Sequence, residues 1–367
     1  MIYRRVIEEL KYNKYLRESG KKIAIPFPFE RFSNYFPGIQ KGRYHIVTAN
    51  SKVGKTKITD FLYAYNVVER VISEGIKAKI LYFSLEVSKE EKIKEVISHK
   101  LYTSYGISLS PEQLSSMFSG YILNDSVLNI IQSKKFTEWL ATFESIVEII
   151  DTKRSGKAIF SEVLRYAANN GRYVDRWGNE LNTDKIHAND SKELSKVDVF
   201  LPKDPDEYVI PIFDHGSLLA FQEDGYSDLR LALNDFSSFY CLYMRDRLKY
   251  SPVLIQQQAA GQESTENFKL NLLQPSASGL GDSKVIGRDC NVMLGLFAPS
   301  RYKIREYKNY DTAVLNDHYR ELSIILNRHG PAVNADLYFN GASNFFCELP
   351  KSEEFLTDPT LYAKYSR

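Results

Sequence analysis

The sequence has little cysteine, no strong excess of either charge and no long hydrophobic run. Three cysteines in 367 residues are too few for a disulfide framework, and neither they nor the six histidines show the spacing of metal ligands. Every apolar run is shorter than the roughly 18 residues that a membrane-spanning helix needs. These features argue against a disulfide-rich secreted domain, a zinc site and a membrane protein, and they favour the reducing cytoplasm.

The charges almost cancel, since 48 Lys and Arg face 46 Asp and Glu, which leaves a net charge of +2. Such a balance gives no global attraction to nucleic acid or to an anionic membrane, so any site for a polyanion has to be local. A hydrophobic fraction of 43% is enough for a substantial core. Disorder over most of the chain is therefore excluded.

The ends of the chain differ from its body. Apolar residues at helical spacing in residues 2–18 predict an amphipathic helix, and a proline-rich segment follows it. We assign residues 1–24 to a linker helix and the segment that leads into the body, and residues 25–350 to the folded domain. Residues 351–367 are polar and are expected to form a C-terminal tail that frays.

Strand-like and helix-like patterns alternate along the body, which predicts parallel βαβ units. The expected fold is α/β, with a largely parallel central sheet flanked by helices and a C-terminal β-hairpin around Asn340-Gly341. Residues 101–149 have a largely helical pattern. Residues 152–206 are polar and rich in turn formers, and they predict one helix near 159–169 followed by a long surface excursion. The predicted strands are residues 44–48, 80–84, 208–213, 253–257, 292–297 and 322–326.

The most informative segment is an apolar strand that runs into Gly54-Lys55-Thr56, after which an apolar stripe continues at helical spacing. The triplet therefore lies at a helix N-terminus, where backbone N–H groups and the helix dipole stabilise a polyphosphate. Lys55 would reach the β- and γ-phosphates, and Thr56 would bind Mg²⁺. The alternative is a basic loop that ends in a helix cap. The residues predicted to contact a nucleotide are Ala49, Asn50, Ser51, Lys52, Val53, Gly54, Lys55 and Thr56.

Two carboxylates follow apolar strands, as the chemistry of nucleotide hydrolysis requires. Glu86 comes after the run at 80–84, and Asp214 directly follows the run at 208–213. The carboxyl ends of parallel strands meet beside a phosphate loop, so we expect Glu86 to polarise the attacking water and Asp214 to hold Mg²⁺ with Thr56. The alternative for each carboxylate is a capping role. Pro211 is unusual inside a strand, because proline donates no ladder hydrogen bond.

With these residues in place, the sequence resembles the DnaB-type replicative helicases, whose motor is a RecA-like ATPase domain that works as a hexameric ring. The resemblance covers residues 25–348. Family members have alanine in the first glycine position of the phosphate loop, as Ala49 is here. Residues 82–88 (Y-F-S-L-E-V-S) are similar to the family's F-S-L-E-M-S segment, with Glu86 at its catalytic glutamate. Asp214 is similar to the Walker B aspartate.

Two further elements extend the resemblance. Residues 251–258 are similar to the strand that ends in the family's glutamine sensor, which places Gln258 at the γ-phosphate, with Gln257 as a close rival. The segment I-L-N-R-H-G-P resembles the K-N-R-x-G-P element, which implies that Arg328 is an arginine finger supplied in trans to the neighbouring subunit's nucleotide. The family's lysine two residues before the finger is Leu326 here. Without the resemblance, Arg328 is interpreted as a turn arginine.

The resemblance implies an ATP-dependent DNA helicase motor that uses ATP and Mg²⁺ and moves on single-stranded DNA as a hexamer. The polar segment from Gly261 to Lys269, together with Lys284, is expected to contact the DNA backbone, with a mobile surface loop as the alternative. Candidate partners are a primase, a polymerase or a loader. The absence of the family's N-terminal domain and the small size indicate a phage-like protein, which would work in the host cytoplasm. Residues 152–206 form a longer segment than the corresponding part of family members.

Two other functions stay open from the sequence. One is another RecA-like ATPase, either a recombinase or a regulatory enzyme, which would share the phosphate loop and Asp214. The other is a nucleotide-holding replication scaffold that does not unwind DNA. The loss of the lysine at Leu326 favours the scaffold, whereas the presence of Glu86 argues against it.

Overall fold

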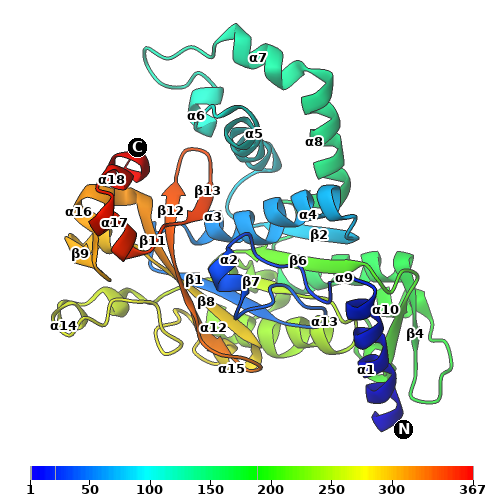
Figure 1. Ribbon diagram of the computed structural model, residues 1–367. Helices are drawn as coiled ribbons and strands as arrows, with labels where there is room; N and C mark the ends of the chain where they lie inside the picture. Colours follow the sequence, from blue (N-terminus) through cyan, green and yellow to red (C-terminus); the bar gives the residue numbers. More distant parts are fainter. Residues whose placement is uncertain (1, 21, 188, 367) are drawn as a thin grey trace.

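The computed structural model describes residues 2–20, 22–187 and 189–366. Its centre is a nine-stranded sheet in the order β13-β12-β11-β8-β1-β7-β6-β2-β3. The strands from β8 to β3 are parallel, and β11, β12 and β13 extend the sheet in antiparallel fashion (Figure 1). This arrangement confirms the predicted α/β fold. The strands of this sheet are β1 (His45–Ala49), β2 (Ala78–Ser84), β3 (Val147–Ile150), β6 (Tyr208–Asp214), β7 (Val253–Gln257), β8 (Val292–Phe297), β11 (Tyr319–Asn327), β12 (Asn334–Asn340) and β13 (Phe345–Glu348).

Helices cover both faces of the parallel strands, which explains why these strands are continuous apolar runs. Side chains alternate between the faces: Ile80 and Tyr82 join one core cluster, whereas Leu81 and Phe83 join the other. Pro211 lies where β6 pairs only with β2, since the ladder to β7 begins at Ile212. The first face carries α3 (Lys55–Thr59), the π-helix η1 (Asp60–Tyr65) and α4 (Asn66–Glu74), and the second carries α9 (Gly156–Asn170), α12 (Leu229–Asp235), the π-helix η4 (Phe236–Cys241), α13 (Leu242–Asp246) and α15 (Ile286–Asp289).

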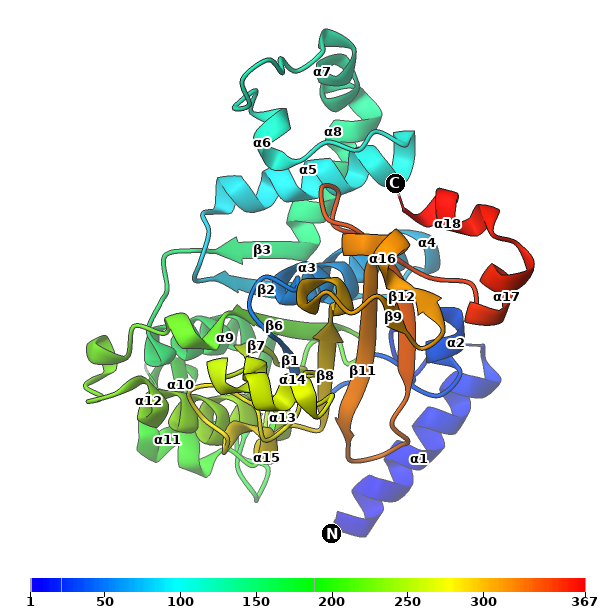
Figure 2. The same ribbon diagram turned by 90° about the vertical axis from the view of Figure 1, so that its left-hand side faces the viewer.

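A helical lobe projects from the first face (Figures 1 and 2). It has a small core of its own around Leu101 and Phe136. The helical pattern predicted for residues 101–149 is correct for most of the lobe, but the segment ends in strand β3, which follows the last helix directly. The helices of the lobe are α5 (Lys89–Tyr105), α6 (Pro111–Leu114), α7 (Asp125–Gln132) and α8 (Lys134–Ile146).

The prediction of a long surface excursion after α9 is wrong. The segment forms a two-stranded ribbon and two short helices, and Tyr173, Leu194 and Phe200 are buried in the core of the second face. Its apolar residues stand singly or in runs of at most three among polar ones, so no sustained periodic pattern marks them in the sequence. These elements are β4 (Gly171–Val174), α10 (Thr183–His187), α11 (Ser191–Lys196) and β5 (Val199–Pro202).

The C-terminal residues are also ordered, contrary to the prediction that they fray. Helices α17 (Ser352–Thr357) and α18 (Thr360–Tyr365) pack against the sheet extension, and Phe355 is buried beside Tyr310 and Leu315. The predicted hairpin is confirmed by β12 and β13. The remaining elements here and after β6 and β7 are η2 (Gly216–Leu218), η3 (Phe221–Asp224), η5 (Ala260–Glu263), α14 (Thr265–Lys269), η6 (Pro299–Tyr302), β9 (Glu306–Tyr307), β10 (Tyr310–Asp311), α16 (Thr312–Leu315) and η7 (Asn316–His318).

The N-terminal helix α1 (Ile2–Glu18) confirms the amphipathic helix predicted there, and it extends away from the body (Figures 1 and 2). The segment after it is anchored, since Ile25 bridges to Ile39 and Phe27 and Phe32 are buried around the short helix α2 (Glu30–Ser33). Among the described helices, none combines the length and the hydropathy that crossing a membrane requires.

Candidate nucleotide site

The predicted phosphate loop lies between β1 and α3. β1 ends at Ala49, and α3 begins at Lys55 and continues through η1 and α4 to Glu74. Gly54 caps this helix with φ +107°, a conformation that favours glycine. The first N–H groups of a helix have no helical partners, so they can bind the oxygens of an anion. The Lys55 ammonium makes no hydrogen bond or ion pair with any described residue, so it remains available to a ligand.

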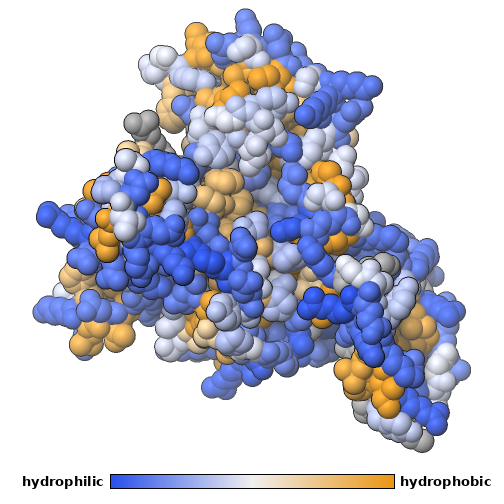
Figure 3. Space-filling model, viewed as in Figure 1, coloured by the Kyte–Doolittle hydropathy of each residue, from blue (hydrophilic) through white to orange (hydrophobic). Residues whose placement is uncertain are grey.

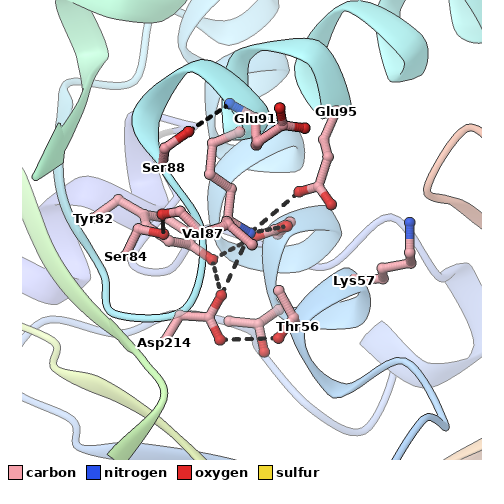
Figure 4. A network of polar contacts seen from close by, with 12 residues as sticks. Thr56, Lys57, Tyr82, Ser84, Val87, Ser88, Glu91, Glu95 and Asp214 are labelled. Atoms are coloured by element: carbon pink, nitrogen blue, oxygen red, sulfur yellow. Dashed lines mark hydrogen bonds and ion pairs between the residues drawn. The ribbon is translucent and has the colours of Figure 1, made fainter. Parts of the chain in front are cut away.

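Asp214 and Thr56 meet at the carboxyl edge of the sheet (Figure 4). Asp214 is the last residue of β6 and is fully buried, and the Thr56 hydroxyl donates a hydrogen bond to its Oδ1 at 2.9 Å. Hydroxyl and carboxylate oxygens are the hard ligands that Mg²⁺ takes beside a phosphate. These two residues therefore fit a magnesium ion. The described chain holds no group of three or more His, Cys, Asp or Glu that could bind a metal elsewhere.

Glu86 lies at the same edge, two residues beyond the end of β2. Because β2 pairs with β6, with Ser84 opposite Asp214, Glu86 comes near the edge that carries Thr56 and Asp214. Its side chain is 52% exposed, and its Oε2 lies 3.9 Å from Nε2 of His215. Burial, and then the charge of Lys55, lower the pKa of His215, which favours the neutral imidazole. Glu86 is thus an exposed carboxylate that can accept a proton from water.

A buried network, called here the Lys92 network, holds the other oxygen of Asp214. It consists of Asp60, Tyr82, Lys92 and Glu95. The Lys92 ammonium lies 3.0 Å from Oδ2 of Asp60, 3.3 Å from Oε2 of Glu95 and 3.4 Å from Oδ2 of Asp214. The Tyr82 hydroxyl lies 2.6 Å from Oδ1 of Asp60 and 2.9 Å from Oδ2 of Asp214. Figure 4 shows Tyr82, Glu95, Thr56 and Asp214 converging on this point.

The charges of this network follow from its burial. Lys92 is only 4% exposed and Asp60 only 2%. Burial raises the pKa of Asp60 to about 7, although the nearby Lys92 limits the rise. Burial alone would lower the pKa of Lys92, but Asp60, Tyr82, Glu95 and Asp214 together raise it. Lys92 therefore stays charged beside the carboxyl groups of Asp60, Glu95 and Asp214.

The two candidate sensor glutamines differ in their surroundings. Gln258 is buried, and its Nε2 donates to Oγ1 of Thr48 at 2.9 Å and to the Ser276 carbonyl at 3.1 Å. Its Oε1 accepts from the Ser276 N–H, so the chain itself occupies this amide. Gln257 pairs in register with Ala49 and makes no side-chain hydrogen bond within the described chain. Of the two glutamines, Gln257 is thus the one whose amide is not engaged by the described chain.

Two contacts that the sequence does not reveal shape the phosphate loop. Arg320 of β11 is buried, its Nε donates to the Val53 carbonyl at 2.9 Å, and its guanidinium lies over the Phe339 ring. Asn50 donates to the Leu273 carbonyl at 3.2 Å and to the Tyr302 hydroxyl. Arg320 and Val53 are 267 residues apart in the chain, so no local pattern predicts their contact.

The polar segment after β7 lies next to the phosphate loop. The Tyr302 hydroxyl, which accepts from Asn50, donates to Glu263 at 2.8 Å, so the loop is linked through one tyrosine to η5. Lys269 and Lys284 are exposed, as a DNA-contacting role requires. Helix α14 stands at the surface in Figure 2.

Arg328 lies at the opposite edge of the sheet. It follows Asn327, which pairs with Val292, and Val292 pairs with His45 at the start of β1. Four residue steps of about 3.3 Å along β1 separate this edge from the loop by ~13 Å or more. The Arg328 Nε donates to the Cys290 carbonyl at 2.8 Å, and its Nη2 donates to the Arg288 carbonyl. Arg328 is therefore remote from Thr56 and Asp214 of the same chain.

A cavity of about 1430 Å³ lies at this far edge. Arg328, Arg43 and Arg288 line it together with Tyr12 and Leu16 of α1. The cavity is thus remote from Thr56 and Asp214, and it brings the N-terminal helix and the predicted finger to the same side of the molecule.

Two solved structures share the fold over almost the whole chain. The ATPase domain of a phage DnaB-like helicase matches with a TM-score of 0.64 and 16% identity, over 95% of this chain and 99% of that one. A DnaB-like replicative helicase, in a structure that also describes its interactions with primase, matches with a TM-score of 0.63 and 16% identity, over 93% of this chain and 66% of that one. Comparisons with protein-family models and with curated sequences find no match. The chain has the fold of the ATPase domain of DnaB-like replicative helicases.

Proposed function

We propose that this chain is the ATP-driven motor of a DNA helicase of the DnaB type. The contact between Thr56 and Asp214, at the N-terminus of the helix that follows β1, is the observation that carries the proposal. It joins a phosphate loop to a buried carboxylate at the carboxyl edge of a parallel sheet, which is where α/β proteins bind nucleotides. The shared fold with helicase ATPase domains supports the same function.

The proposal gives each residue of the site one task. The backbone N–H groups of residues 53–56 and the Lys55 ammonium bind the phosphates of ATP, and Thr56 and Asp214 hold Mg²⁺. When bound, the ion neutralises charge on the transferred phosphoryl group. Glu86 accepts the proton of the attacking water. Gln257, whose amide has no hydrogen-bond partner in the described chain, contacts the γ-phosphate in place of Gln258.

Hydrolysis requires a second subunit in this account. Arg328 is too far from its own site, so it serves the nucleotide of a neighbour, as a head-to-tail ring allows. We propose a hexamer, in keeping with the resemblance. Helix α1 supports assembly, because it stands away from the body and exposes apolar side chains, which gather over it in Figure 3. Those side chains are Tyr3, Val6, Ile7, Leu10, Tyr12 and Tyr15.

DNA would be held by the polar segment after β7. Its backbone N–H groups and the exposed Lys269 and Lys284 suit contacts with a phosphate backbone. Six copies would multiply a small positive charge, so a net charge of +2 is no obstacle. The link from Asn50 through Tyr302 to Glu263 connects the nucleotide loop with this segment. A primase is the first protein partner to test, and a polymerase and a loader follow.

The test is ATP-dependent displacement of a labelled strand from a forked duplex, with Lys55→Ala and Arg328→Ala as inactive controls. The helicase proposal predicts strand release by the wild type alone. If the wild type hydrolyses ATP on single-stranded DNA and releases no strand, the chain is a RecA-like ATPase of another kind.

Two observations favour a second candidate, a nucleotide-holding replication scaffold. The guanidinium of Arg328 is bound to carbonyl groups of its own chain, and Leu326 stands where the resemblance expects a lysine. A scaffold would bind ATP at the same site but hydrolyse it no faster in the presence of DNA. Measuring the ATPase rate with and without single-stranded DNA separates the two candidates.

A further inference from the structure

We propose that Lys92 is a positioning residue that holds Asp214 in the orientation needed to bind the nucleotide's magnesium ion. This inference rests on the proposed function, because it concerns the same metal. The observation behind it is that the two oxygens of Asp214 have different partners. Oδ1 accepts from Thr56, whereas Oδ2 faces the Tyr82 hydroxyl and the Lys92 ammonium.

Lys92 reaches Asp214 only because three elements converge on it. The lysine comes from α5, Asp60 from the π-helix η1 and Asp214 from the end of β6. The ammonium is 3.0 Å from Asp60 and 3.4 Å from Asp214, and it lies 4.9 Å from the centre of the Tyr82 ring. A side chain with three rotatable donors is thus fixed by contacts on several sides.

The arrangement orients the carboxylate. If Lys92 were uncharged, Asp60 and Asp214 would face each other through Tyr82 with no cation between them. Oδ2 of Asp214 would lose the cation that holds it, and repulsion between the two side chains would turn Asp214 away from Thr56. This change spoils the pair of oxygens that fits magnesium. A residue that fixes a metal ligand in this way commonly contributes about ten- to hundredfold to metal affinity.

The contact also ties the metal site to the segment that carries Glu86. Helix α5 begins at Lys89, three residues after Glu86, and Ser88 caps it by accepting from the Glu91 N–H. Anchoring α5 at Lys92 therefore fixes the start of this helix relative to Asp214. The same lysine therefore positions both Asp214 and the segment that carries Glu86.

The experiment measures binding of a slowly hydrolysed ATP analogue by calorimetry while Mg²⁺ is varied. Lys92→Met keeps the length and apolar stem of the side chain but removes its charge. We expect the Mg²⁺ concentration for half-maximal binding to rise about ten- to a hundredfold, with little change in the binding measured without Mg²⁺. The matched control is Lys94→Met on the same helix, because Lys94 pairs with Glu91 near the surface. It should behave as the wild type.

A second variant tests the same inference if Lys92→Met folds poorly. In Asp60→Asn with Lys92→Met, both charges of the buried pair are removed, which commonly restores stability. We expect it to melt near the wild-type temperature. It should still need more Mg²⁺, because Oδ2 of Asp214 has lost the Lys92 ammonium 3.4 Å away even though Asp60 no longer repels it. A double variant with wild-type Mg²⁺ dependence overturns the inference and leaves the proposed function intact. A wild type without Mg²⁺-dependent binding removes the proposed function and this inference with it.

Discussion

The strongest prediction concerns Arg328, which we propose serves the nucleotide of a neighbouring subunit. The perturbation is a pair of variants, Lys55→Ala and Arg328→Ala, studied alone and as a mixture. Arg328 lies at the edge where β1 begins, ~13 Å or more from the loop that follows β1. An arginine finger contributes roughly 10³ to 10⁵ in rate, or about 4 to 7 kcal/mol of barrier. Each variant alone should therefore be almost inactive.

The mixture separates a finger in trans from a finger in cis. An interface is intact when the nucleotide side has Lys55 and the finger side has Arg328, even if the two subunits carry different mutations. Random assembly of equal amounts makes about one interface in four intact, so about a quarter of the wild-type ATPase rate should return if interfaces act independently. If Lys55 and Arg328 worked within one subunit, the mixture would stay inactive.

The assay is steady-state ATP hydrolysis, preceded by native mass spectrometry to show that both variants assemble and exchange subunits. Arg328→Gln serves as a milder variant, since it can keep a hydrogen bond to the Cys290 carbonyl. No recovery of activity in well-mixed rings would refute the trans assignment. The Thr56 and Asp214 site would be untouched by that result.

Three further predictions follow from particular contacts. Gln257→Ala should lower kcat for ATP hydrolysis without changing the melting temperature. Gln258→Ala should instead lower the free energy of unfolding in urea by about 1 to 3 kcal/mol, because Thr48 and Ser276 lose their hydrogen-bond partner. Arg320→Met should weaken ATP binding, measured by calorimetry, and lower the free energy of unfolding by about 1 to 3 kcal/mol. The reason is that the Val53 carbonyl loses its buried donor. Unchanged affinity for ATP would contradict a role of Arg320 in shaping the loop. Burial lowers the pKa of His99 to about 4. The unfolded chain therefore binds the extra proton first, and stability should fall as the pH drops from about 6.5 towards 4, less so in His99→Phe; equal slopes for both proteins would count against it.

The sequence predicts well those features that depend on residues close together in the chain. β7 and β8 have the predicted bounds, because strands buried on both faces are continuous apolar runs. Gly54, Lys55 and Thr56 can be located because a strand, a loop and a helix follow one another there. The placement of Asp214 beside Thr56 follows from the rule that parallel strands end at the same edge.

The rest depends on contacts between distant segments. Strand β3 has no signal of its own in the sequence, because its apolar residues continue the pattern of α8 with no glycine or proline between them. Phe355 lies in a largely polar tail. Its pocket beside Tyr310, where Leu361, Tyr362 and Tyr365 also pack, explains why the tail is ordered. Lys92 lies in a charged helix and has the pattern of a solvated residue until Asp60 and Asp214 are brought to it.

The central claim is that a triphosphate binds to the backbone around Val53 and Thr56, and calorimetry tests it most directly. Titration of a slowly hydrolysed ATP analogue with Mg²⁺ should give one site per subunit in the wild type, and Lys55→Ala should lose most of the affinity. Absence of binding heat in a folded wild-type protein, confirmed by an unchanged melting temperature at saturating nucleotide, would contradict the account.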